Sequence, residues 1–212
     1  MPFELGRPLG VPNDPIFQTR VLLSALKLLE AERGPVLAQY PEEAPIIKTD
    51  ADPLACPVNF AYPIEEMNTT QRLLTIFEQE MAQLRNWYDL ALEKRGRTTS
   101  GTTELEPKEL AAFIADFVRG KRQNDQISDL SLASFLRMAS EDLKAYYFEA
   151  VCAQPGQPGD SASLADWFWS QTAAAKVINM VRMICIGSED KELEQLGKRR
   201  LIPVNQLHRF KD

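Results

Sequence analysis

The hydrophobic positions of this chain recur at helical spacing over most of its length. The longest clear amphipathic stretch begins at Asn68, where Gln71 three residues later completes a capping box, and it ends at Gly96. Its apolar residues follow one another at intervals of three or four: Leu74, Phe77, Met81, Leu84 and Tyr88. This spacing places the side chains on one face of an α-helix. We expect this helix to bury that face against others.

Glycine, proline and capping residues divide the rest of the chain into five further predicted helices. They run from Asp14 to Gly34-Pro35, from Pro107 to Gly120, from Asp129 to the break at 154–160, from Asp160 or Ser161 to about Ile186, and from Ser188 to Leu196. The stretch around 173–175 contains three alanines. Because small residues allow close helix contact, we expect that helix to lie near the middle of the fold.

The first predicted helix carries apolar residues on two adjacent faces. One face holds Phe17, Val21, Ala25 and Leu28. A second row lies beside it, made of Leu22, Leu26 and Leu29. After this helix, residues 35–67 contain six prolines, which exclude a long helix there. We expect an ordered arm, with a short strand possible at residues 45–48.

These elements do not alternate between strand and helix, so a doubly wound sheet is improbable. We predict an all-α fold, a helical bundle of about six helices with an irregular Pro-rich N-terminal arm. Residues 1–67 would form the first helix plus the arm, packed on the body. Residues 68–200 would form the bundle, and residues 201–212 a frayed basic tail.

Composition narrows the possible functions of this 212-residue chain. Its net charge of −6 argues against a nucleic-acid surface. No window is long and apolar enough for a membrane span, and the N-terminus lacks the apolar region of a signal peptide. Three distant cysteines, Cys56, Cys152 and Cys185, favour a reducing, cytoplasmic location. With His208 the single histidine, histidine-based zinc sites and triads are excluded, and we predict no metal and no cofactor.

The segment from Arg95 to Gly101 is the first candidate site. Arg95 and Arg97 supply guanidinium groups, and Thr98 and Thr99 supply hydroxyls, so the loop could surround a phosphate or carboxylate. The alternative is a helix C-terminus, in which Gly96 ends the helix and the arginines favour the negative end of its dipole. The second interpretation is the more common one for such a sequence.

Other candidate residues lie on the predicted helices. Tyr88 and Asp89 precede the loop, and Asp89 could orient a neighbouring arginine toward a ligand. Tyr146 lies four residues after Asp142, so the two share a helical face, and a buried Asp142 could bond a tyrosine hydroxyl or an arginine. The cluster Asp166, Trp167, Phe168 and Trp169 is either core or part of an interface or pocket, since tryptophan is enriched in both.

Several stretches resemble proteins related to selenoprotein B of glycine/sarcosine/betaine reductase. They are Phe3 to Gly10 followed by Asn13-Asp14-Pro15, WYDLALEKRGRTT at 87–99, EDLKAYYFEAVCAQPGQ at 141–157, and LADWFWSQTAA at 164–174. The resemblance covers most of the chain. Those reductases attack their substrate through a selenocysteine or cysteine on a Rossmann-like part, which is absent here, and no cysteine of this chain lies in a matching motif. The resemblance therefore implies an accessory or C-terminal module and transfers no catalytic residue.

Two functional hypotheses follow. The first is a non-catalytic helical module that binds a partner, either a second copy or a reductase-like subunit. The second is a small-anion or small-molecule binding protein, or an enzyme, that uses the loop from Arg97 to Ser100 together with Tyr88, Asp89 and the tyrosines near residue 146. We favour the first, because ligands and nucleophiles are scarce.

Overall fold

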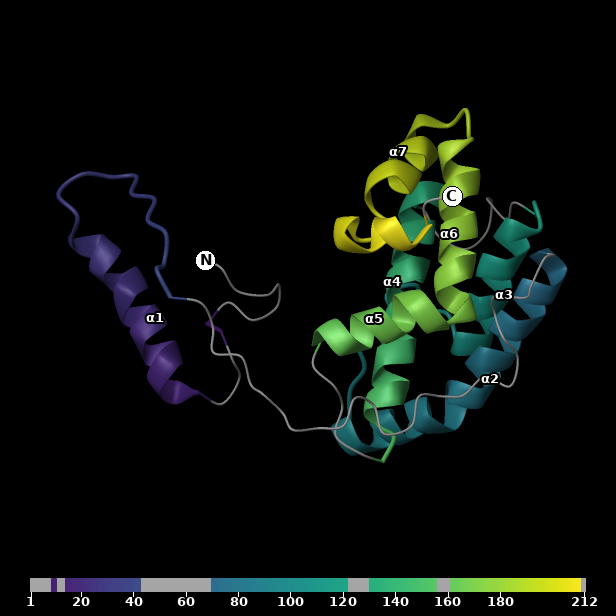
Figure 1. The fold of residues 1–212 in the computed structure, drawn as a ribbon, viewed down its shortest axis with the longest axis horizontal. Helices are drawn as coiled ribbons and strands as arrows, with labels where there is room; N and C mark the ends of the chain where they lie inside the picture. The colour runs from purple at the N-terminus through teal and green to yellow at the C-terminus, as the bar shows by residue number, and fades with distance from the viewer. Residues whose placement is uncertain (1–8, 11–13, 43–69, 122–129, 156–160, 211–212) are drawn as a thin grey trace. The chain divides into compact units, whose positions relative to one another are not determined.

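A computed structural model describes residues 9–10, 14–42, 70–121, 130–155 and 161–210. Every regular element assigned within these residues is a helix (Figure 1). There are seven α-helices and two 3-10 helices. The predicted all-α class is therefore confirmed for the part of the chain that the structure describes. The chain divides into two compact units, residues 1–50 and residues 51–212.

The first unit is built on α1 (Pro15–Lys27), which the 3-10 turn η1 (Leu28–Glu30) extends. Asp14 is the N-cap, because its carboxylate accepts a hydrogen bond of 3.0 Å from the amide of Phe17. Only Phe17 and Val21 of this helix are buried. They form a small cluster with Tyr40, whose ring lies edge-on to that of Phe17.

The second unit contains the other six α-helices. They are α2 (Thr70–Arg95), α3 (Pro107–Val118), α4 (Leu132–Cys152), α5 (Ser161–Gln171), α6 (Ala173–Ile186) and α7 (Lys191–Arg199). Helix α2 packs against α3, α4 and α6, and α6 also packs against α3, α5 and α7. The alanines at 173–175 are fully buried. The predicted central position of this helix is confirmed.

The predicted continuous helix from residue 160 to residue 186 is wrong, because the chain breaks at Thr172. The backbone of Thr172 is extended, at φ −96° and ψ 150°, and its hydroxyl accepts a hydrogen bond from the amide of Ala175. Threonine thus acts as an N-cap inside an otherwise helical pattern. As a result α5 runs across the direction of α4 and α6 (Figure 1).

Two predicted helix starts also differ from the structure. The N-cap of α4 is Ser131 rather than Asp129, because the Ser131 hydroxyl accepts from the amide of Ser134. Helix α7 begins at Lys191 rather than at Ser188, with Asp190 as its N-cap. The possible strand at 45–48, Cys56, Asn68 and most of the Pro-rich arm lie outside the described residues.

The C-terminal segment is packed on the second unit, so the prediction of a frayed tail is wrong for residues 201–210. Leu201 and Ile202 are buried directly after α7. The 3-10 helix η3 (Val204–Phe210) follows, and the ring of Phe210 lies edge-on to Trp169 at 6.1 Å. Arg209 binds the carboxylate of Asp166. Scattered apolar residues in a basic sequence therefore anchor this segment.

Candidate functional site

The candidate loop begins at the C-terminus of α2. Gly96 ends the helix with a φ of +65°, and its amide donates to the carbonyl of Leu92 at 2.8 Å. The predicted capping role of Gly96 is confirmed, since this left-handed conformation favours glycine. The side chains of Arg95 and Arg97 on either side are exposed.

The threonines of the loop bind a carboxylate of the protein itself. Glu149 of α4 accepts hydrogen bonds from the Thr98 hydroxyl at 2.8 Å, and from the Thr99 amide and hydroxyl, each at 2.7 Å. The Tyr88 hydroxyl donates to the Thr98 hydroxyl at 3.0 Å. The structure thus brings together Tyr88, Thr98 and Thr99 as predicted. An external anion would have to displace Glu149 from these donors.

Asp142 fixes the second half of the same loop. Its carboxylate accepts from the Thr102 amide at 2.9 Å, the Thr103 amide at 2.8 Å and the Thr103 hydroxyl at 2.7 Å. The expectation of a tyrosine or arginine partner was wrong. Burial raises the pKa of Asp142, but the hydrogen bonds from Thr103 and Thr102 outweigh it and leave the pKa below its usual value. Asp142 therefore anchors the loop as a carboxylate.

The other predicted residues on α2 and α4 are divided between the core and the surface. The ring of Tyr88 packs against that of Tyr146 at a tilt of 43°, with centroids 4.7 Å apart, and the Tyr146 hydroxyl donates to the carbonyl of Met81. Burial raises the pKa of Tyr146 well above its usual value. Asp89 is exposed and pairs with Arg85, one turn earlier on the same helix.

The aromatic cluster on α5 belongs to the core. Trp167 and Trp169 are only 3% and 4% exposed, and they surround the fully buried Phe168. The Tyr147 ring packs edge-on against Phe168. Of the two interpretations, the structure supports the core for both tryptophans, and Asp166 alone is exposed.

Glu80 is an internal carboxylate that the sequence analysis missed. It is 1% exposed, and it accepts hydrogen bonds from the Ala173 amide at 2.8 Å, the Ala174 amide at 3.3 Å and the Tyr147 hydroxyl at 2.9 Å. Burial raises its pKa to about 7, against the lowering effect of these hydrogen bonds. Glu80 thus joins α2 to the N-terminus of α6. The sequence signal for a buried carboxylate was the position of Glu80, three residues after Phe77 and on the apolar face of α2.

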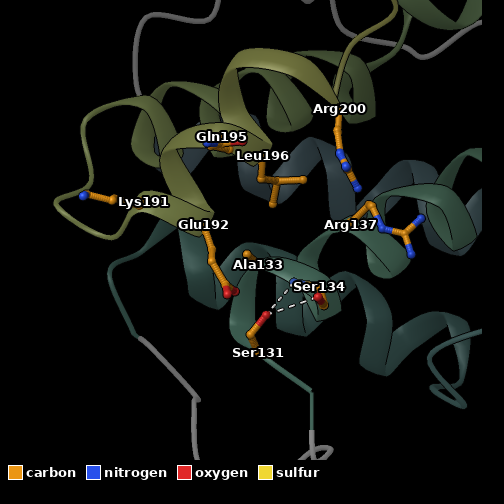
Figure 2. Close-up of a pocket in the computed structure, with 9 residues that line it drawn as sticks. All are labelled: Ser131, Ala133, Ser134, Arg137, Lys191, Glu192, Gln195, Leu196 and Arg200. Atoms are coloured by element: carbon orange, nitrogen blue, oxygen red, sulfur yellow. Dashed lines mark hydrogen bonds between the residues drawn. The ribbon is translucent and has the colours of Figure 1, made fainter.

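A basic cleft is the second feature that the sequence analysis missed. It lies between the start of α4 and α7, has a volume of about 430 Å³, and is lined by Ser131, Ala133, Ser134, Arg137, Lys191, Glu192, Gln195, Leu196 and Arg200 (Figure 2). Arg137 and Arg200 are 63 positions apart in the sequence, so only the fold brings them together.

The exposed aliphatic face of α1 is the third surface feature. Leu22, Leu23 and Leu26 of α1 are 47%, 52% and 57% exposed, and Leu29 of the turn η1 that extends the helix is 82% exposed. Exposed aliphatic residues that gather along one segment indicate a binding surface more strongly than single ones do.

The described residues show neither a membrane span nor a metal site. No helix among them is long and apolar enough to cross a bilayer, and no three His, Cys, Asp or Glu side chains are grouped to hold a metal ion. The Cys185 thiol is buried, which raises its pKa to about 11. Burial also raises the pKa of Cys152. Neither thiol is therefore activated as a nucleophile at neutral pH.

Comparisons with protein-family models, with curated proteins and with solved structures find no match to this chain. They provide no relative from which the role of a residue could be transferred. The resemblance to selenoprotein B-related reductases stays a prediction.

Proposed function

We propose that this chain is a non-catalytic helical interaction module that self-associates through the exposed face of α1. The single observation that carries the proposal is the row of Leu22, Leu26 and Leu29, each about half exposed or more. These positions follow the i, i+4, i+7 pattern by which an amphipathic helix binds a partner. Leu23, 52% exposed, lies beside this row.

The composition of this face favours a second copy as the occupant. Arg20, Ser24 and Lys27 each precede one of the three leucines by two residues, which turns the helix by about 200° and places them on the opposite side. Arg20 also has its own partner, Glu42, at 2.9 Å. The leucine row therefore carries no charge that would require a complementary charge on a different protein. An uncharged aliphatic face can pack against a second copy of itself, as a two-fold symmetric interface requires.

The size of the face predicts a weak dimer. Three leucines on α1 and one on η1 are far fewer than the roughly 20–30 residues a side of a stable interface. Full burial of a leucine contributes about 1.5–3 kcal/mol, so burying the exposed half of each contributes about 1 kcal/mol. We therefore expect dimerisation to depend on protein concentration. The second unit of each copy should stay folded whether or not the dimer forms.

Sedimentation velocity over a range of protein concentrations tests the proposal. The wild-type chain should shift from monomer to dimer as concentration rises. The double variant Leu22→Ser/Leu26→Ser should stay monomeric, because each substitution removes about 1 kcal/mol from each side of the interface. Both side chains are exposed, so the variant should fold.

The matched control is Leu92→Ser, which removes a 39% exposed leucine from α2. This variant should dimerise like the wild type. A wild-type chain that stays monomeric at every concentration would refute self-association. If Leu92→Ser weakened dimerisation as much as Leu22→Ser/Leu26→Ser does, the interface would not be the leucine face of α1. Capture of a reductase-like subunit by a strictly monomeric chain would instead support the partner that the sequence resemblance implies.

A further inference from the structure

We infer that the basic cleft between α4 and α7 binds a small polar phosphate monoester, with the phosphate held between Arg137 and Arg200. Arg137 lies near the start of α4, and Arg200 directly follows α7. Figure 2 shows the Arg200 side chain extending toward Arg137, and both residues line the cleft. Guanidinium groups offer paired N–H donors that match the oxygens of a phosphate.

The charge of the cleft is opposite to that of the whole chain. Arg137, Arg200 and Lys191 line it, against the single acid Glu192, although the chain carries a net charge of −6. Among the described residues neither arginine forms an ion pair with a carboxylate. Two guanidinium groups that share a cleft repel each other unless an anion lies between them.

Two other arginines of the same unit, Arg85 and Arg119, form ion pairs. Arg85 binds Asp89, and Arg119 binds Glu78, both through oxygens 2.8–2.9 Å away. In these two cases a carboxylate of the bundle already occupies the guanidinium group. Arg137 and Arg200 lack such carboxylates within the described part of the chain, which leaves their donors available to a ligand.

The rest of the cleft limits the size and the polarity of the part of the ligand that lies outside the phosphate. The volume of about 430 Å³ is in the range of small-molecule sites. Ser134 and Gln195 line it with groups that can hydrogen-bond hydroxyls. Figure 2 shows Glu192 pointing toward the serines at the end of the cleft away from the two arginines. A carboxylate there can accept from a hydroxyl but repels a second phosphate, so the site favours a monophosphate.

Isothermal titration of the full chain with fructose, fructose 6-phosphate and fructose 1,6-bisphosphate tests this inference. Fructose 6-phosphate should bind, fructose should not, and the bisphosphate should bind more weakly. Arg137→Gln and Arg200→Gln should each weaken binding of the monophosphate by about 10-fold or more, because each removes charge-assisted hydrogen bonds. Glu192→Gln should narrow the gap between the monophosphate and the bisphosphate.

The matched control is Arg72→Gln, which removes the same charge from an exposed position on α2. It should leave binding unchanged, whereas an equal loss in this variant would show non-specific attraction and overturn the inference. The absence of binding by fructose 6-phosphate, or equal binding of fructose, would overturn it as well. The two arginines are exposed, and an unchanged melting temperature of the free variants would confirm that they fold.

Discussion

The Glu80 carboxylate makes the stability of the second unit depend on pH. Its pKa is raised from 4.5 to about 7, with burial as the main cause. Between these two values the folded chain holds a proton that the unfolded chain has released. The free energy of unfolding therefore falls as pH rises through this window. The pKa difference, at about 1.4 kcal/mol per unit, corresponds to about 3 kcal/mol, a large part of the stability of an ordinary domain.

The substitution Glu80→Gln isolates this effect, because glutamine has nearly the same shape and does not titrate. Lys176 lowers the pKa of Glu80 by its charge, and Tyr147 lowers it by a hydrogen bond, so both groups belong to the titrating cluster. The side-chain amide of glutamine keeps one oxygen that can accept from the Ala173 amide, but its nitrogen is a donor and faces the donors at Ala174 and Tyr147. We expect Glu80→Gln to be less stable than wild type at pH 5 and to recover relative to it by about 3 kcal/mol at pH 8.

Urea unfolding of the wild type, Glu80→Gln and the control Glu93→Gln at pH values from 5 to 8 provides the assay. Glu93 is an exposed glutamate on the same helix, so its variant should follow the wild type at every pH. A constant difference between Glu80→Gln and wild type across this range would refute the reasoning, because it would mean that Glu80 does not change protonation there.

Two further predictions concern the loop and the C-terminal segment. Asp142→Asn should cost about 1–3 kcal/mol in urea unfolding, because it turns a donor toward the buried amide and hydroxyl of Thr103. Since the pKa of Asp142 is lowered in the folded chain, its contribution to stability should be present above pH 3.8 and be lost as pH falls further. An Asp142→Asn variant as stable as wild type at pH 7 would contradict this prediction. Phe210→Ala removes the ring that packs on Trp169. Limited proteolysis should then cut the C-terminal segment faster than in wild type, and equal rates would show that the contact does not anchor it.

Much of the helical fold could be predicted because the apolar spacing is local information. The start of α3 at Pro107 and the end of α2 at Gly96 each follow from one residue with a restricted or permissive backbone. The break at Thr172 could not be predicted in this way. Its extended backbone exposes the first amides of α6 to Glu80, which lies 93 positions before Ala173 in the sequence. The partner that makes this break favourable is therefore visible only in three dimensions.

Part of the predicted candidate site comes together in the structure, whereas Asp89, Asp166 and the two tryptophans lie elsewhere. Tyr88, Thr98 and Thr99 do converge, and the loop does bind a carboxylate, but that carboxylate is Glu149 of the same chain. The sequence of such a loop indicates that it binds an anion. It does not reveal whether that anion is a carboxylate of the same chain or a separate ligand. Glu149 lies three residues after Tyr146, on the buried face of α4. An acid at such a position was the sequence signal for an internal partner of the loop.

Hydrogen exchange of the α1 amides at low and at high protein concentration tests the central claim most directly. In one copy, α1 has 13 residues and buries only Phe17 and Val21, so its amides should exchange quickly, as those of a marginal helix do. If two copies pair through the leucine face, protection of these amides should increase with protein concentration, while protection in α2 and α6 stays constant. Exchange in α1 that does not change with concentration would contradict the account.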